Sequence, residues 1–385
     1  MNKMSDKELQ LHIRAVILLV LSMIAIAMMG AVARQNWDSK VTAFPTKTEG
    51  AINEYANQLL REMTLEEKVA QMMFALDTAD SELAAELGLG GVLLGEANLG
   101  DLGRSEVSAV VSGFQTGSDI PMFIGVNEEG GDYNTLSKYP SIRSVPYLSP
   151  AELMTTGGVA LVESETEDKC ELLRSMGINL NFGPVCDVTT AQSAYMYGRA
   201  LGRDADETAR YAEAVVKVMN EERVVGVMKH FPGYGNLAVK GNNRVFTDTR
   251  SMEQFETEDL LPFARGLKAE GKMVMMGHSV VTALDDQAPA SLSRKVHNYL
   301  RRNYGFEGVI ITDELNVPGL GRYGTPEELA VAAVKAGSDM LLTADYEVQI
   351  PAVVRAVMEG EIARERIDES VLRILKLKIA FGIIQ

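Results

Sequence analysis

The chain has 385 residues, of which 46% are hydrophobic and 23% are charged, and its formal net charge is −16. This balance is typical of a globular protein and excludes collagen-like, coiled-coil and wholly disordered chains. A surface this acidic repels phosphate backbones, so we expect no nucleic acid among the partners. Only two cysteines occur, Cys170 and Cys186, so no disulfide framework holds the fold, and a single bridge between them is the most that the sequence allows.

A long apolar segment lies near the N-terminus. Residues 15–33 read AVILLVLSMIAIAMMGAVA and carry no charge, which is about the length that a helix needs to cross a bilayer. Arg34 closes the segment, and Trp37 follows at an interfacial position. We therefore predict a transmembrane helix over 15–33. A cleaved signal segment is the alternative, because residues 31–33 read AVA, the small-x-small form of a cleavage site.

The apolar segment divides the chain into four predicted parts. Lys and Arg residues are equally frequent on its two sides, so the positive-inside rule does not decide the orientation. A large domain after a lone N-terminal span is usually exported, so we place it outside the cytoplasm, anchored to the cell membrane or secreted if the segment is cleaved. The parts are a cytoplasmic tail over 1–14, the membrane segment over 15–33, a polar linker over 34–50 and a barrel domain over 51–385.

From residue 51 onward, eight short apolar runs alternate with helix-like segments. The runs lie at 71–76, 90–95, 121–126, 178–185, 224–230, 272–278, 308–313 and 339–344. Nearly continuous apolar runs are typical of strands that are buried on both faces of a parallel sheet. Eight strand–helix units predict a (β/α)8 barrel of the α/β class. An open doubly wound sheet is the alternative, and the absence of a G-x-G-x-x-G motif after the first run counts against it.

Polar side chains follow the apolar runs, at the strand ends where chemistry collects in such barrels. They are Asn127, Glu128, Glu129, Asp187, Lys229, His230, His278, Asp313, Glu314 and Asp345. Because the carboxyl ends of parallel strands meet at one end of a barrel, we expect these side chains to face a common site. Carboxylates accept hydrogen bonds and Lys and His donate them, so the set suits a small ligand rich in hydroxyl groups.

Three chemistries are compatible with this set of residues alone. Lys229 would form a Schiff base in an aldolase-type enzyme if burial lowered its pKa. His230 and His278 would bind the metal of a hydrolase, although neither an H-x-H nor an H-E-x-x-H spacing is present. Asp313 would act as the nucleophile or charge stabiliser of a glycosidase. The strand-end pattern does not choose among them.

The segment K-H-F-P-G-Y-G at 229–235 resembles the K-H-F-P-G-H-G motif of family 3 glycoside hydrolases, in particular of the single-barrel β-N-acetylhexosaminidase branch. Further segments resemble the family in the same order along the chain. They are MTLEEKVAQM (63–72), GGVLL (90–94), EEGGD (128–132), GINLNFGPVCDV (177–188), PASLS (289–293), GFEGVIITDEL (305–315) and AVKAGSDMLL (333–342). The resemblance covers nearly the whole barrel domain and implies a glycosidase that needs no metal or organic cofactor.

The resemblance also implies roles for particular residues. Asp313 in I-T-D-E-L takes the position of the catalytic nucleophile, which attacks the anomeric carbon in a retaining mechanism. The positions that contact the sugar in the family are occupied here by Lys229, His230, Arg199, His278 and Asn127, and the last of these replaces an aspartate. The implied substrates carry terminal N-acetylglucosamine-type residues and belong to extracellular or cell-wall glycans.

The sequence departs from the family where the general acid/base is expected. The family has an Asp-Ser-His triplet whose histidine transfers the proton, and this chain has Lys240-Gly241-Asn242. Gly and Asn cannot deliver a proton near neutral pH, and lysine is a poor donor. Asp248, Glu128 or Glu129 would have to replace the missing acid. If none of them does, the protein is a catalytically impaired sugar-binding or regulatory relative.

Overall fold

The structure is a computed structural model that describes residues 48–238 and 245–385. The predicted cytoplasmic tail, the membrane segment 15–33 and residues 34–47 of the linker lie outside the described residues, and so do Lys240, Gly241 and Asn242. Among the residues that the structure describes, no helix combines the length and the hydropathy that are needed to span a bilayer.

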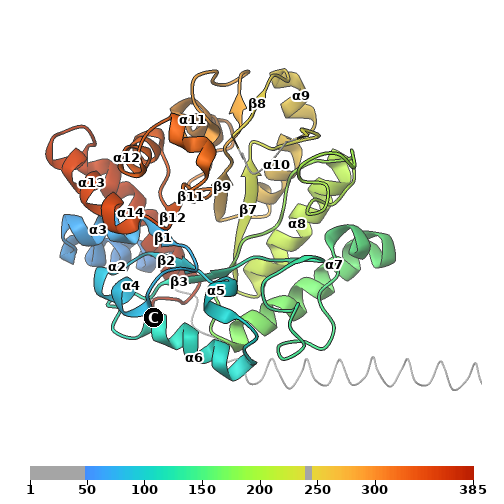
Figure 1. Cartoon of the computed structure of the whole chain (residues 1–385), viewed down its shortest axis with the longest axis horizontal. Helices are drawn as coiled ribbons and strands as arrows, with labels where there is room; N and C mark the ends of the chain where they lie inside the picture. Colours follow the sequence, from blue (N-terminus) through green and yellow to red (C-terminus); the bar gives the residue numbers. More distant parts are fainter. Residues whose placement is uncertain (1–47, 239–244) are drawn as a thin grey trace, which may run out of the picture. The chain divides into compact units, whose positions relative to one another are not determined.

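Eight parallel strands form a nearly closed barrel (Figure 1). They are β1 (Met73–Ala75), β2 (Gly91–Leu93), β3 (Phe123–Val126), β6 (Leu180–Asn181), β7 (Val225–Phe231), β9 (Met273–Met276), β11 (Val309–Thr312) and β12 (Leu341–Thr343). Neighbours in the sheet follow the order β12, β1, β2, β3, β6, β7, β9 and β11. A parallel bridge between Ile311 and Met340 then connects β11 to β12. Each predicted apolar run yields one strand, which confirms the barrel and excludes the doubly wound sheet.

Helices surround the strands on the outside of the barrel (Figure 1). They are α2 (Glu49–Glu62), α3 (Leu65–Gln71), α4 (Ser81–Leu87), α5 (Glu96–Leu99), α6 (Arg104–Gln115), α7 (Pro150–Ser175), α8 (Ala205–Glu221), α9 (Met252–Thr257), α10 (Leu260–Lys268), α11 (Arg294–Asn303), α12 (Pro326–Ala336), α13 (Tyr346–Met358) and α14 (Arg364–Ala380). All four residues of β9 and all four of β11 are buried. Strands covered by helices outside and by each other inside need apolar side chains at every position, which explains the continuous runs.

Two short strand pairs extend the barrel beyond its C-terminal strand ends. β4 (Glu128–Gly130) pairs antiparallel with β5 (Tyr133–Asn134) directly after β3. β8 (Thr247–Asp248) pairs parallel with β10 (Val280–Val281), which follows β9. We call this end of the barrel the mouth and the end at the N-termini of the strands the foot. The two strand pairs frame the mouth, where the predicted site residues emerge.

The core is formed by apolar side chains and contains no disulfide in the described part of the chain. Phe74 and Phe182 pack edge to face, with ring centroids 5.2 Å apart. Gly125 leaves room for these rings, because a Cβ atom there would lie 2.8 Å from Cε2 of Phe182. Cys170 and Cys186 are both buried free thiols, so the single bridge that the sequence allowed does not form. Burial raises the pKa of the Cys170 thiol to about 12, which keeps it protonated and unreactive.

Candidate active site

A cavity of about 400 Å³ opens at the mouth of the barrel and collects most of the predicted site residues. The polar side chains that line it include Asn127, Glu129, Asp132, Arg199, Lys229, His230, Asp313 and Glu314, with Glu96 and Lys138 among the others. Asp313 directly follows β11, Asn127 directly follows β3, and Lys229 and His230 belong to the end of β7. The parallel topology therefore brings five of the six predicted site residues to one cavity, although they lie up to 186 positions apart in the chain (127 to 313).

Glu129 lies at the centre of the charged network in this cavity. Its carboxylate contacts Lys229 Nζ at 2.6 Å and receives two hydrogen bonds from the Arg199 guanidinium, at 2.6 and 3.0 Å. Burial alone would raise the pKa of Glu129, but the positive charges and hydrogen bonds of Lys229 and Arg199 lower it to about 2. Glu129 is therefore ionised at neutral pH, and it fixes two cationic donors at the cavity wall.

Lys229 and Arg199 are held as donors toward the cavity. Lys229 Nζ donates to Asn127 Oδ1 at 2.9 Å and pairs with Glu129, which leaves one of its three N–H groups for a ligand. Burial lowers the pKa of Lys229, and the charge of Glu129 opposes that shift. Arg199 stacks against Tyr133, with its guanidinium carbon 5.3 Å from the ring centroid. Both cationic side chains are thus held in place at the cavity by contacts within the protein.

His230 is oriented by a buried aspartate. Its Nδ1 lies 2.8 Å from Asp187 Oδ2, and the same carboxylate accepts the backbone N–H groups of His230 and Tyr234, at 3.3 and 2.9 Å. Because an ionised carboxylate only accepts, Nδ1 carries the proton in this pair. The Nε2 atom is then the ring nitrogen that His230 presents to the cavity that it lines.

His278 is the predicted site residue that does not line the cavity. Its side chain is fully buried, with Nδ1 2.8 Å from Ser291 Oγ and Nε2 2.8 Å from the carbonyl oxygen of Glu314. A carbonyl oxygen can only accept, so Nε2 donates and holds the peptide group that follows Glu314. Asp313 itself is 7% exposed, and its Oδ1 accepts the backbone N–H of Glu314 at 2.8 Å. The structure therefore places His278 against the backbone of the residue after Asp313, outside the lining of the cavity.

The three carboxylates considered as replacement acids have other partners. Glu128 is fully buried, and its two oxygens accept the backbone N–H groups of Leu136 and Ser137, at 2.8 and 3.0 Å. Asp248 is also fully buried and pairs with Arg250 at 2.7 Å. Glu129 lines the cavity but is ionised, as described above. In this arrangement none of the three is placed or protonated to donate a proton to a ligand.

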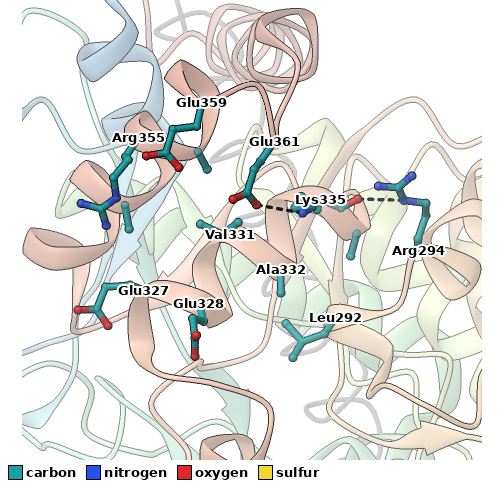
Figure 2. A pocket seen from close by; sticks show the side chains of 13 residues that line it. Leu292, Arg294, Glu327, Glu328, Val331, Ala332, Lys335, Arg355, Glu359 and Glu361 are labelled. Atoms are coloured by element: carbon teal, nitrogen blue, oxygen red, sulfur yellow. Dashed lines mark hydrogen bonds and ion pairs between the residues drawn. The ribbon is translucent and has the colours of Figure 1, made fainter.

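A second cavity, of about 560 Å³, lies on the outside of the barrel between α12 and α13 (Figure 2). Glu361 and Lys335 form an ion pair across it at 3.2 Å, and Arg294 Nε donates to the Lys335 carbonyl at 3.1 Å. None of the strand-end residues lines it. Within residues 48–238 and 245–385, no group of three His, Cys, Asp or Glu side chains is placed to hold a metal ion. The cavity at the mouth is therefore the candidate active site.

A parallel barrel with a charged cavity at its C-terminal strand ends has the architecture of a barrel enzyme. Residues 64–377 match the model of the glycosyl hydrolase family 3 N-terminal domain. The chain belongs to this family of glycoside hydrolases, which confirms the resemblance seen in the sequence.

Curated relatives and solved structures agree with this assignment. The chain is 30% identical to beta-hexosaminidase LpqI of Mycobacterium bovis over 329 residues, which cover 81% of this chain and 82% of that protein. It is 32% identical to a beta-hexosaminidase of Tolumonas auensis, covering 75% and 85%. Mycobacterium tuberculosis LpqI has a similar structure, with a TM-score of 0.75, 26% identity and coverage of 84% and 96%. A family 3 beta-N-acetylglucosaminidase from Paenibacillus gives a TM-score of 0.77 and 28% identity, covering 83% of this chain and 63% of that one.

Proposed function

We propose that the protein is a retaining glycosidase that removes terminal N-acetylglucosamine-type residues from extracellular or cell-wall glycans, with Asp313 as the nucleophile. The observation that carries this proposal is that Asp313 shares one cavity with Lys229, His230 and Arg199. A carboxylate beside two fixed donors, Lys229 and Arg199, and one acceptor, His230 Nε2, suits a sugar ring that is held by its hydroxyl groups while its anomeric carbon is attacked. The names of the curated relatives support the substrate class.

Each side chain has a defined part in the proposed reaction. The free N–H of Lys229, the Arg199 guanidinium and the Nε2 atom of His230 bind sugar hydroxyls, and Asn127 fixes Lys229 through its amide oxygen. An oxygen of Asp313 forms a bond to the anomeric carbon while the glycosidic bond breaks and its electron pair goes to the leaving oxygen. Water then attacks the same carbon and returns the electron pair to Asp313, so the configuration is retained.

A covalent trap tests the proposal directly. A fluorinated N-acetylglucosamine donor with an activated leaving group slows the second step, so the glycosyl-enzyme accumulates and peptide mapping locates the label. We expect label on the peptide that contains Asp313, and none in Asp313→Asn. Hydrolysis of a nitrophenyl N-acetylglucosaminide should fall to background in the same variant. Equal rates for the two proteins, or label elsewhere, would exclude Asp313 as the nucleophile.

The second candidate function is a sugar-binding or regulatory protein in which catalysis is impaired. The observation that favours it is the sequence of residues 239–244, VKGNNR, which contains no carboxyl and no imidazole group. In this case N-acetylglucosamine would bind to the cavity, and Lys229→Met would weaken binding, but no donor would be hydrolysed and no label would form. Calorimetry with the sugar, measured beside the trapping experiment, separates the two functions.

We also propose that residues 15–33 anchor the barrel on the outer side of the cell membrane. The support is the uncharged segment of 19 residues that precedes the family domain (15 to 33). Membrane fractionation and the intact mass of the protein test this proposal. An anchored protein keeps its N-terminus in the membrane fraction, is digested by protease added to whole cells, and loses its membrane association when residues 1–33 are deleted.

A further inference from the structure

The proposed nucleophile is held by hydrogen bonds to its backbone and to its side chain. The Asp313 N–H donates at 2.8 Å to the carbonyl oxygen of Met276, the last residue of the neighbouring strand β9, so the barrel fixes the backbone. Asp313 Oδ1 accepts the Glu314 N–H at 2.8 Å, and this bond acts on the direction of the carboxylate. The position of the Glu314 backbone therefore affects how the Asp313 carboxylate faces a sugar ring in the cavity.

His278 holds the Glu314 backbone from the end of β9. Its Nε2 donates to the Glu314 carbonyl oxygen at 2.8 Å. Its Nδ1 lies 2.8 Å from Ser291 Oγ, so both ring nitrogens are engaged and the imidazole has little freedom to turn. An imidazole that is fixed in this way transmits the position of its own backbone to Glu314. The group that fixes the His278 backbone therefore also acts on Asp313.

The hydroxyl group of Tyr234 fixes the His278 backbone. Tyr234 is buried, and its hydroxyl oxygen accepts the His278 N–H at 3.1 Å. The phenol lies so close to this segment that a Cβ atom at Gly277 would be 2.9 Å from the hydroxyl oxygen, so only glycine fits there. The Tyr234 ring packs against the rings of Tyr195 and Phe246, with centroids 5.8 and 5.0 Å away. These rings hold the hydroxyl group against the end of β9.

We propose that Tyr234 is a positioning residue for the nucleophile Asp313, an inference that rests on the proposed function. Printed along the chain of contacts, the hydroxyl group holds His278, His278 holds Glu314, and Glu314 donates to the carboxylate. Burial raises the pKa of the Tyr234 phenol, and the negative charge of Asp313 raises it further, so the two groups lie within electrostatic range of each other. Tyr234 stands where the family motif K-H-F-P-G-H-G has its second histidine, so the contact is made by a residue that departs from the motif.

The backbone of Tyr234 has a separate role on the sugar-binding side. Its N–H donates to Asp187 Oδ1 at 2.9 Å, and the other oxygen of this carboxylate lies 2.8 Å from Nδ1 of His230. Tyr234→Phe keeps that N–H and the ring, and it removes the hydroxyl group alone. The substitution therefore separates the attack by Asp313 from the binding of the sugar at His230.

The rate of covalent labelling with the fluorinated N-acetylglucosamine donor measures the attack by Asp313. At saturating donor we expect this rate to fall by about 10- to 100-fold in Tyr234→Phe, because a misplacement of about 1 Å costs a reaction on the order of 10²-fold. The Kd for N-acetylglucosamine, measured by calorimetry, should stay within about twofold of wild type, since the lost contact acts on the nucleophile. Tyr299→Phe on α11 removes a hydroxyl group that contacts Glu256 at 3.2 Å, and as the matched control it should change neither value.

A double-mutant cycle tests the path through His278. His278→Ala removes the imidazole that donates to Glu314, so it should lower the rate of labelling at least as much as Tyr234→Phe does. Without the imidazole, the hydroxyl group of Tyr234 no longer acts on the carboxylate. We therefore expect the combined variant to be labelled at about the rate of His278→Ala alone, whereas the losses of two independent sites would multiply.

The outcomes separate this inference from the proposed function. Labelling of Tyr234→Phe at the wild-type rate would overturn the positioning role. Losses that multiply in the combined variant would also overturn it, as would a weakening of N-acetylglucosamine binding by the same factor as the loss of rate. In each of these cases label on Asp313 of the wild-type protein would still support the proposed function. Absence of that label would remove the proposed function, and the inference with it.

Discussion

Glu129 at the mouth and Asp339 at the foot are both buried carboxylates that bind several cations, yet their surroundings differ. Asp339 lies two residues before β12 and contacts Arg301, Arg373 and Arg366 at 2.5, 3.2 and 3.5 Å. Its oxygens also accept from the Ile310 N–H and the Ser370 hydroxyl, at 2.9 and 2.6 Å. Glu129 binds Lys229 and Arg199 and lines a cavity.

The comparison shows that access to a cavity, more than the strength of the ion pairs, separates a structural cluster from a candidate site. The cations of Asp339 come from α11 and α14 and fasten these helices to the barrel. The cations of Glu129 keep N–H groups that face the cavity. Removing one partner of a buried ion pair lowers the free energy of unfolding, because the other charge stays unpaired. We therefore expect substitutions at the foot to reduce stability, and substitutions at the mouth, where the cations line a cavity, to reduce ligand binding as well.

The largest effect is expected for Asp339→Asn. The substitution removes the charge that three guanidinium groups share, and it should lower the free energy of unfolding by roughly 3–5 kcal/mol. Urea unfolding monitored by circular dichroism measures this loss. The kcat/KM of the folded fraction should stay within about twofold of wild type, because Asp339 lies at the opposite end of the barrel. A stable variant with reduced activity would contradict the division between foot and mouth.

The second effect is a loss of folding stability on acidification, to which His297 at the foot contributes at a higher pH than Glu129 at the mouth. His297 is buried there, and burial lowers its pKa from 6.5 to about 4, while Arg366 and Arg301 act in the same direction and Asp339 opposes them. Between pH 6.5 and 4 the folded state therefore binds fewer protons at His297 than the unfolded state does. The contribution of neutral His297 to stability is complete above pH 6.5 and is lost as the pH falls toward 4. For Glu129, whose pKa is lowered from 4.5 to about 2, the loss begins only below about pH 4.5.

Urea titrations between pH 7 and pH 4 test this order. The His297 contribution corresponds to up to about 3 kcal/mol. We expect His297→Gln to flatten the stability profile between pH 6.5 and 4, and Glu129→Gln to leave that part of the profile unchanged. If Glu129→Gln instead flattened the stability profile between pH 6.5 and 4, the loss of stability in that range would come from Glu129 at the mouth and not from His297 at the foot.

The sequence predicts the barrel and most of the mouth because both depend on local patterns. A strand covered on both faces must be apolar throughout, and a polar residue directly after such a strand must emerge at the mouth. The role of Glu129 was not predicted, because its partners Arg199 and Lys229 lie 70 and 100 positions away (199 − 129 and 229 − 129) and only the closed barrel brings them together. The orientation of His278 likewise depends on Ser291, a contact that no spacing rule indicates.

The third effect concerns Lys229→Met at the mouth. Methionine keeps much of the buried stem but removes the donor to the sugar, and Glu129 keeps Arg199 as its cation. Because a hydrogen bond from a charged group contributes roughly 1.5–3 kcal/mol, we expect kcat/KM for the nitrophenyl donor to fall by about 10- to 150-fold. Steady-state kinetics and the melting temperature are measured on the same preparation. An unchanged kcat/KM would show that Lys229 serves only to hold Glu129.

The smallest effect is expected for the same change at an exposed ion pair, Lys335→Met on α12. Lys335 is 41% exposed and pairs with Glu361, which is 52% exposed, so solvent screens the pair and each partner regains water when the other is removed. The free energy of unfolding should change by at most about 0.5 kcal/mol and kcat/KM should stay at the wild-type value. Both Lys→Met variants remove the same ammonium group. The difference between their losses of kcat/KM therefore measures the contribution of a buried lysine at the mouth relative to an exposed one. An equal loss of kcat/KM in both would assign a binding role to the outer cavity of Figure 2 as well.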